Sequence, residues 1–510
     1  MTDQADVLAL LADPAAHGPG VDTVERVDTH ISSVFLAGDR AWKLKRAVRL
    51  PFLDFTTVAA RRTFCRREVV VNRAAAPTLY LGVAPVERLP DGRLVIGAIR
   101  TDDPEDAAEN QAVDWLVAMR RFDQDTLFDR LARRGQLTDE HMRRLGEVVA
   151  RFHGAAAPRP DRGGLAAMRA VVEGNRLAAV AFVPAVFTAA AVADLTQAIL
   201  ARLDAVGDLL EARRAAGLVR HCHGDLHLGN ICLVDGQPTL FDAIEFNEDF
   251  AVIDIAYDLA FLLMDLESRG LRPLASTLFN DAMAHGGDTG ALPLLPVFLA
   301  MRAFIRAHVA AAMARETEAR HYLALAGRLL EPVPPRLVAV GGLSGSGKSL
   351  TSRLLAPAIG AAPGALVVRS DVLRKRLLGS PLYERLGPDG YTAAMTRRTY
   401  QALYDEAERA LRAGHSVIAD AVFADPAERR TVEDLARRLG VPFHGLWLEA
   451  SPATMADRIA SRRRAVSDAT GEVLERQLGY DLGDMAWSRI DSSGPRGATV
   501  TAARRIIGIE

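Results

Sequence analysis

The stretch GLSGSGKS at residues 342–349 constrains the fold of this 510-residue chain more than any other feature. It follows the apolar run LVAV and precedes a run with helical spacing. A buried strand, a glycine-rich turn and a helix in this order form a P-loop, whose backbone N–H groups surround phosphate oxygens. The sequence therefore predicts an α/β P-loop domain with a mainly parallel sheet.

The side chains of this turn also have roles in ATP chemistry. Lys348 is predicted to reach the outer phosphates and to assist catalysis, and Ser349 is predicted to bind Mg²⁺. The predicted ATP-binding residues of the turn are Gly342, Leu343, Ser344, Gly345, Ser346, Gly347, Lys348, Ser349 and Leu350.

Carboxylates and arginines beyond the turn favour a kinase over a motor. Asp371 follows the strand-like run LVVR and is the predicted catalytic base for an acceptor hydroxyl, with Arg374 binding the acceptor. Asp420 ends the apolar run SVIAD and is a predicted metal ligand. Arg458 and Arg462 lie in an arginine-rich helix predicted to close over the phosphates of ATP. The alternatives are a helix cap for Asp371 and a solvated charge run for the arginines.

A proline-rich stretch, EPVPPR at residues 331–336, separates this domain from what precedes it. Three prolines in six residues prevent a continuous helix and favour an extended linker. The sequence therefore predicts two domains, residues 1–332 and residues 333–510, separable by limited proteolysis within the linker.

The composition of the chain indicates the compartment in which the protein is expected and the kinds of partner it is expected to bind. A net charge of −2 gives no reason to expect a dedicated nucleic-acid or membrane-surface protein, so a nucleic-acid partner is considered only for the second domain. Three cysteines are too few for a disulfide framework, and no basic and apolar leader opens the chain. These features predict a cytoplasmic protein whose partners are small-molecule phosphate acceptors. The oligomeric state stays open.

A second chemical signature is HCHGDLHLGNIC at residues 221–232. Phosphoryl transfer needs a carboxylate near the acceptor proton and oxygen ligands for Mg²⁺. Asp225 suits the first role as catalytic base, and Asn230 and Asp242 suit the second. The histidines and cysteines also raise the alternative of a zinc site, but no second Cys or His pair follows at zinc-site spacing. The sequence predicts a kinase site without zinc.

The spacing His-x-Asp-x-x-x-x-Asn resembles the loop of the aminoglycoside-phosphotransferase and choline-kinase branch of the protein-kinase-like superfamily. The resemblance covers residues 25 to 330 and implies an α+β, bilobal fold. A glycine-rich loop before Lys43 is absent, as in that branch.

The same resemblance assigns further residues. It implies a strand lysine that holds ATP phosphates, for which Lys43 is preferred and Lys45 remains open, paired with Glu68 on a helix. It also implies that Asp258 braces the catalytic loop, and His223 is expected to have a similar structural role.

Residues 337–510 resemble small P-loop kinases of the gluconate-kinase, polynucleotide-kinase and zeta-toxin kinds. The whole chain is similar to bacterial fusions of an aminoglycoside-phosphotransferase-like domain with an AAA-type or zeta-toxin-like P-loop kinase domain. The resemblance does not identify a substrate for either half. The function we predict is a bifunctional ATP- and Mg²⁺-dependent phosphotransferase acting on hydroxyl groups of small polar metabolites of the sugar or aminocyclitol type. The alternatives are a polynucleotide 5′-kinase in the second half, or a nucleotide-dependent regulator or toxin-like module.

Overall fold

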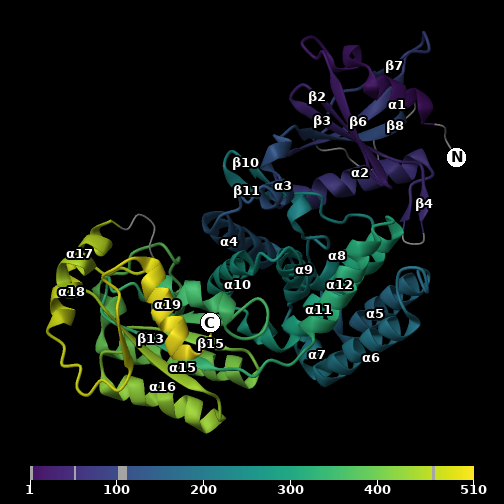
Figure 1. Ribbon diagram of the computed structural model, residues 1–510. Helices are drawn as coiled ribbons and strands as arrows, with labels where there is room; N and C mark the ends of the chain where they lie inside the picture. The colour runs from purple at the N-terminus through teal and green to yellow at the C-terminus, as the bar shows by residue number, and fades with distance from the viewer. Residues whose placement is uncertain (1–3, 51–52, 102–111, 462–465, 510) are drawn as a thin grey trace. The chain divides into compact units, whose positions relative to one another are not determined.

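The computed structural model describes residues 4–50, 53–101, 112–461 and 466–509 (Figure 1). Its packing divides the chain into two compact units. The first unit consists of Met1–Arg144, Arg151–Met168 and Gly207–Leu262. The second consists of Leu145–Ala150, Arg169–Val206 and Leu263–Glu510.

The first unit is built on a six-stranded antiparallel sheet with the order β1-β2-β3-β8-β6-β7. The two-residue turn Gly38–Asp39 joins β2 to β3 and sets Phe35 opposite Trp42. The strands are β1 (Val24–Asp28), β2 (Ser32–Ala37), β3 (Arg40–Lys45), β6 (Tyr80–Arg88), β7 (Leu94–Ile96) and β8 (Ala112–Arg120).

Side chains alternate between the two faces of the sheet along β3, which decides which of them face α2 (Val58–Arg73). Trp42 and Leu44 pack in a core cluster with Leu11 of α1 (Ala5–Ala12). Ala41 belongs to the cluster on the other face of the sheet, and Lys43 and Lys45 share its direction because side chains alternate along a strand. That face is covered by α2.

Helices and short hairpins complete the first unit. A two-stranded pair, β10 (Ile231–Val234) and β11 (Gln237–Leu240), follows the predicted catalytic loop. The other elements are η1 (Pro14–His17), β4 (Arg49–Leu50), β5 (Leu53–Asp54), η2 (Gln124–Thr126), α3 (Phe128–Arg133), α7 (Gly207–Ala215), β9 (Val219–His221), η3 (Leu228–Asn230), α8 (Glu248–Ala251) and β12 (Val252–Asp254). Three helices contribute residues to both units: α4 (Asp139–Ala155), α5 (Gly164–Val180) and α9 (Ile255–Ser268).

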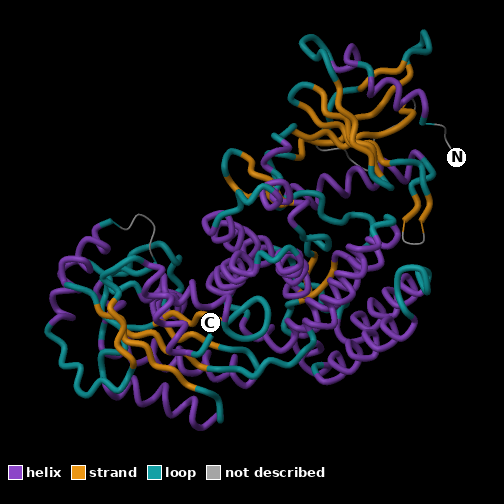
Figure 2. Tube along the Cα trace, viewed as in Figure 1, coloured by secondary structure: helices purple, strands orange, loops and turns teal. Residues whose placement is uncertain are grey.

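The second unit contains a five-stranded parallel sheet with the order β14-β15-β13-β16-β17, drawn in orange in Figure 2. The central strand β13 is buried at every position, as expected for a parallel sheet covered by helices on both faces. The strands are β13 (Leu337–Gly341), β14 (Leu366–Arg369), β15 (Val417–Asp420), β16 (Phe443–Glu449) and β17 (Ser488–Asp491).

Helices flank this sheet. One side packs α13 (Lys348–Leu355) and α19 (Arg496–Ile507) into a core with the strands. The helices α15 (Ala393–Arg412) and α16 (Pro426–Leu439) contact the strands as well. The remaining elements are α6 (Ala189–Ala205), α10 (Arg272–Gly286), η4 (Thr289–Leu294), α11 (Leu295–Ala312), α12 (Glu316–Leu329), η5 (Ala356–Ala358), α14 (Ser370–Leu377), η6 (Pro388–Tyr391), α17 (Pro452–Ala460) and α18 (Gly471–Leu478).

The predicted fold class is confirmed: a kinase-like α+β region precedes an α/β P-loop domain with a parallel sheet. The proline-rich segment 331–335 has no regular structure and is mostly exposed. The packing-based second unit nevertheless begins at Leu263, well before this segment. The domain boundary at 332/333 therefore stays a prediction.

Among the described residues, one helical stretch, Thr289–Ala312, is long and apolar enough to span a membrane. Most of it is buried inside the protein, and core helices of water-soluble proteins pass the same test. It is a hydrophobic core element of the second unit.

Candidate functional site

A cluster of two lysines and three carboxylates occupies the space between β3 and α2. Lys43 Nζ donates to Glu68 Oε1 at 2.8 Å and to Asp242 Oδ1 at 2.5 Å. Lys45 Nζ donates to Glu68 Oε2 at 2.6 Å and also contacts Glu245. Glu68 thus binds both lysines that the sequence left as alternatives, and only Lys43 contacts Asp242.

The charges of this cluster stabilise one another. Burial alone raises the pKa of Glu68, but the ammonium groups of Lys43 and Lys45 outweigh it and lower the pKa to about 2. Burial lowers the pKa of Lys43, yet Asp242 and Glu68 raise it well above its usual range. Glu68 is an anion and Lys43 a cation at neutral pH, so the two form a charged pair.

Asp225 lies in the loop between β9 and β10. Asn230 Nδ2 donates to the Asp225 carboxylate at 3.1 Å and to the Asp225 backbone oxygen at 3.0 Å. His227 Nε2 lies 3.4 Å from the same carboxylate. The Asp225 side chain is 41% exposed, so an acceptor hydroxyl can reach it.

The loop is held in place by Asp258, the first-turn aspartate of α9. Its buried carboxylate accepts from the backbone N–H groups of His223 at 3.2 Å and Gly224 at 2.9 Å. His153 Nε2 lies 2.9 Å from it. His223 itself lies with Nε2 2.9 Å from the Phe241 carbonyl, which ties the loop to the segment before Asp242. Both residues therefore contact the backbone of the loop or of the segment that follows it.

The group His153, Cys222 and Asp258 also brings three metal-binding residue types together. Their ligand atoms lie within 4.8 Å of one another and are buried. The Asp258 carboxylate, however, already accepts two backbone hydrogen bonds. The cluster is explained as part of the loop brace.

Asp242 lies two residues beyond the end of β11. Its φ of +63° is a left-handed conformation that non-glycine residues rarely adopt. Its backbone N–H donates to the Tyr80 hydroxyl at 3.0 Å, and Phe241 N donates to Asn230 O at 3.0 Å. These contacts set Asp242 beside Asn230.

The side-chain oxygens of Asn230 and Asp242 are suitable ligands for a magnesium ion. The Asn230 amide nitrogen is directed to Asp225, which leaves its amide oxygen for another partner. The Asp242 side chain is 43% exposed. Carboxylate and amide oxygens are the ligands that Mg²⁺ prefers.

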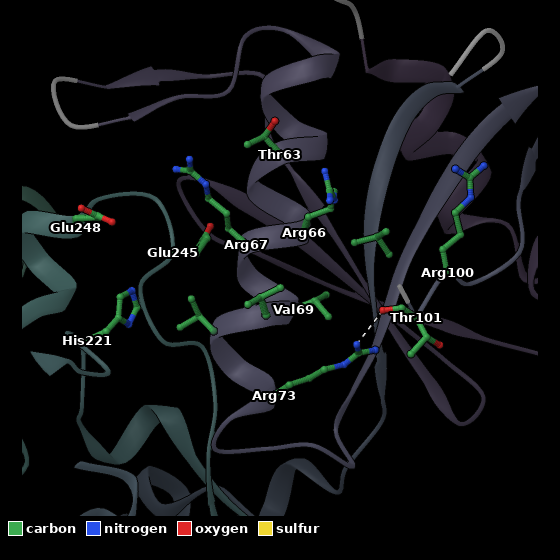
Figure 3. A pocket seen from close by; sticks show the side chains of 13 residues that line it. Thr63, Arg66, Arg67, Val69, Arg73, Arg100, Thr101, His221, Glu245 and Glu248 are labelled. Atoms are coloured by element: carbon green, nitrogen blue, oxygen red, sulfur yellow. Dashed lines mark hydrogen bonds between the residues drawn. The ribbon is translucent and has the colours of Figure 1, made fainter. Parts of the chain in front are cut away.

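A cavity of about 720 Å³ lies beside α2. Figure 3 shows Arg66, Arg67 and Arg73 of α2 around it, with His221 and Glu248 to the left of the helix and Arg100 and Thr101 to its right. Asp225, Asn230 and Asp242 do not line it. The cavity therefore touches the lysine cluster through Glu245 but is separate from the catalytic loop.

The P-loop connects β13 to α13 in the second unit. Gly345 has φ +85°, and a Cβ there would lie 2.5 Å from the Met455 carbonyl oxygen, so a larger residue does not fit. Ser344 N donates to the Gln477 side chain at 2.7 Å. Lys348 Nζ lies 3.0 Å from the Leu343 carbonyl oxygen, directed over the loop. The turn thus folds as the sequence predicted for phosphate binding.

Arg369, the last residue of β14, joins the two predicted metal ligands of this unit. Its Nη2 lies 3.3 Å from Ser349 Oγ, and its Nε lies 3.4 Å from Asp420 Oδ2. Asp420 is buried at the end of β15, and its Oδ2 has no hydrogen-bond partner within the described ranges. An unsatisfied buried carboxylate oxygen near a serine hydroxyl fits a Mg²⁺ site.

Asp371 and Arg374 both lie in α14. The helix N-cap position is Arg369, so Asp371 is in the first turn and is not the cap. Its carboxylate has no hydrogen-bond partner in the part of the chain that the structure describes. Arg374 is buried: Nη1 donates to the Gly390 carbonyl at 2.8 Å, and the guanidinium lies 4.8 Å from the Tyr391 ring centre. Arg374 thus supports the segment beside the site, and its acceptor-binding role stays a prediction.

Arg458, one of the two arginines predicted to close over the phosphates of ATP, lies at the P-loop. Its Nη2 donates to Ser492 O at 2.7 Å, and its Nη1 lies 3.4 Å from the Gly345 carbonyl. Arg462 is outside the described residues.

Sequence reasoning missed three residues of these sites: Glu245, Tyr80 and Arg369. Glu245 and Tyr80 act through long-range contacts that no local pattern reveals. Arg369 carried a usable signal, because it ends a buried strand directly before the predicted base.

Two protein families match separate regions of the chain. Residues 104–293 match the phosphotransferase enzyme family, and residues 337–480 match an AAA domain. An uncharacterized protein of Mycobacterium tuberculosis (strain ATCC 25618 / H37Rv) is 30% identical over 518 residues, covering 97% of each chain.

Solved structures resemble the two parts separately. A choline/ethanolamine kinase family protein from Mesorhizobium loti is 15% identical, covers 65% of this chain and 95% of its own, and has a TM-score of 0.38. A gluconokinase from Sinorhizobium meliloti is 22% identical, covers 34% of this chain and 91% of its own, and has a TM-score of 0.25.

The near-complete coverage of the mycobacterial relative shows that the two domains occur together as one architecture. The first matched region is of a phosphotransferase family and the second is an AAA domain with a P-loop, so the chain is a phosphotransferase that uses a nucleotide. The chain belongs to the family of that mycobacterial protein, in which a phosphotransferase-enzyme-family domain is fused to a C-terminal AAA-type P-loop domain.

Proposed function

We propose that the chain is a bifunctional kinase that transfers the γ-phosphoryl group of ATP to hydroxyl groups of small polar metabolites at two separate sites. The observation that carries the proposal is that each unit combines a lysine, side-chain oxygens of the kinds that Mg²⁺ prefers and an aspartate that is not fully buried. A nucleotide-binding scaffold needs no such aspartate.

At the first site, Lys43 holds the ATP phosphates, and Asn230 and Asp242 hold Mg²⁺, which neutralises charge on the phosphates. The oxygen of the acceptor hydroxyl attacks the γ-phosphorus, and the bond from the γ-phosphorus to the β-phosphate oxygen breaks. Asp225 accepts the proton that the hydroxyl loses. Asn230 orients Asp225 through its 3.1 Å hydrogen bond.

At the second site, the P-loop amides and Lys348 hold the phosphates, and Ser349 and Asp420 are the Mg²⁺ ligands. Asp371 is the base for the acceptor. Arg369 contacts both Ser349 and Asp420, so its guanidinium would give up these contacts if Mg²⁺ bound between them.

A polynucleotide 5′-kinase activity at the second site is the alternative. Arg374, the residue predicted to bind the acceptor, is buried against Tyr391. This contact favours a small acceptor over a nucleic acid at that position.

The proposal is tested by measuring ADP formation with four full-length proteins: wild type, Asp225→Asn, Lys348→Ala and the double variant. Two independent sites predict that each single variant keeps part of the wild-type rate and that the double variant keeps none. A single variant that loses all activity would show that only one site is catalytic.

A further inference from the structure

The edge of the parallel sheet is closed by a helix from the other family domain. β14 is an edge strand, hydrogen-bonded on one side to β15. On its open side lies α10, which falls within the residues that match the phosphotransferase family, 104–293. Both elements belong to the second compact unit.

Asn280 of α10 forms side-chain hydrogen bonds with backbone groups on the open edge of the sheet, where a further strand would otherwise pair. Its Oδ1 accepts from Val367 N at 2.7 Å, and its Nδ2 donates to Ala365 O at 3.1 Å. These two backbone groups flank Leu366 and point outward from the edge strand. A side-chain amide offers one donor and one acceptor, as a paired peptide group does, so it satisfies both.

Further contacts hold the helix that follows β14. Arg376 of α14 donates from Nη2 to Met283 O at 2.9 Å and Ala284 O at 3.3 Å. These are carbonyls of the last turn of α10, where the helix dipole attracts a cation. Arg376 Nη1 also donates to Glu406 of α15 at 3.1 Å. The segment from β14 through α14 is therefore fixed from its outer side by α10.

This segment carries Arg369 and the predicted base Asp371. Arg369 ends β14 and contacts Ser349 and Asp420, and Asp371 lies in the first turn of α14. We propose that Asn280 is a positioning residue of the P-loop site: by pairing with β14 it holds Arg369 and Asp371 in place, so that activity there depends on a helix of the phosphotransferase domain. The proposal rests on the proposed kinase function of the P-loop site.

The test uses the full chain with Asp225→Asn, so that the first site is silent. Asn280→Ala removes both contacts to β14. Arg272→Ala is the matched control, because Arg272 lies on the same helix and donates to Gly360 O at 3.1 Å without touching β14 or α14. ADP formation from Mg-ATP and hydrogen–deuterium exchange are measured for each protein.

Asn280→Ala is expected to lower kcat about tenfold and to leave KM for ATP within about twofold, because small misplacement of reacting groups slows the chemical step while the P-loop itself is untouched. Exchange should accelerate in peptides covering residues 366–377 and not in those covering residues 337–350. Arg272→Ala should match the parent in both measurements.

An Asn280→Ala protein with the parent's kcat and the parent's exchange at 366–377 overturns the proposal. So does exchange that accelerates equally across residues 337–509, which indicates a general loss of stability. If the parent forms no ADP that depends on Lys348, the proposed function fails instead, and the exchange pattern alone decides whether Asn280 positions the segment.

Discussion

Lys45 Nζ lies 2.6 Å from Glu68 Oε2, and both side chains are almost completely buried. The other oxygen of Glu68 binds Lys43, whose side chain is 12% exposed. The second partners differ: Lys45 contacts the buried Glu245, whereas Lys43 contacts the exposed Asp242. The two lysines are therefore predicted to have different functions, with Lys45 holding the cluster together and Lys43 binding the nucleotide.

Lys45→Met is expected to lower the free energy of unfolding by about 3–5 kcal/mol, because it leaves Glu245 buried without its cation. Lys43→Met should cost less stability but should weaken ATP binding at the first site. Urea unfolding and ATP titration, both in a Lys348→Ala background, measure the two effects. Equal stability losses for the two variants would contradict the division of roles.

Asp225→Asn is expected to slow transfer at the first site by about 10²–10⁴, the usual contribution of a positioned base. Nucleotide affinity should stay close to that of wild type, because the base does not bind the nucleotide. Turnover and ATP titration in the Lys348→Ala background check this. Asp235→Asn is the control, since Asp235 is an exposed aspartate on the nearby β10–β11 turn. A parallel fall of affinity and turnover would assign Asp225 to nucleotide binding.

The fold class and the P-loop could be predicted because their signals are local. Glycines, an apolar strand and a helix follow one another between residues 337 and 355. Lys43, Glu68 and Asp242 were proposed separately, and their meeting depends on how α2 packs on the sheet. The role of Asn280 could not be predicted, because its partners Ala365 and Val367 lie more than 80 residues away and α10 has no sequence signal for covering an edge strand.

At the P-loop site, Lys348→Ala is expected to abolish nucleotide binding, whereas Asp371→Ala should keep binding and lose transfer by about 10²–10⁴. Both are measured in the full chain with Asp225→Asn, by nucleotide titration and by phosphoryl transfer. The exposed Asp389, on the neighbouring η6, provides the control Asp389→Ala. Transfer by Asp371→Ala at the parent's rate would favour the switch or regulator alternative.

Limited proteolysis is expected to cut within the exposed segment 331–335. Because Asn280 and Arg376 link α10 to the P-loop domain, we expect the two fragments to remain associated after the cut. Size-exclusion chromatography of the nicked protein under native conditions measures this. Elution as two separate folded fragments would show that the contacts of α10 are too weak to hold the domains together.

His415 makes the P-loop domain sensitive to acid. Its ring lies 5.5 Å from Phe279 of α10, and burial lowers its pKa to about 4. Since the unfolded chain binds a proton near pH 6.5 and the folded chain does not, stability is fully present above pH 6.5 and is lost as the pH falls toward 4.

The expected loss from this group is about 2 kcal/mol between about pH 6.5 and pH 5. His415→Gln keeps a donor for the Gly364 carbonyl but cannot titrate. Thermal unfolding at both pH values should show a smaller acid-induced shift in the variant. An identical shift in both proteins would mean that other groups control the acid sensitivity.

Transfer of a phosphoryl group to an acceptor hydroxyl at both sites can be measured directly by mass spectrometry. A library of polar metabolites, sugars and aminocyclitols is analysed after incubation with the full chain, ATP and Mg²⁺. We expect at least two phosphorylated products, one lost in Asp225→Asn and the other lost in both Lys348→Ala and Asp371→Ala. ATP consumption that yields only ADP and free phosphate, with no phosphorylated metabolite from either site, would contradict this expectation.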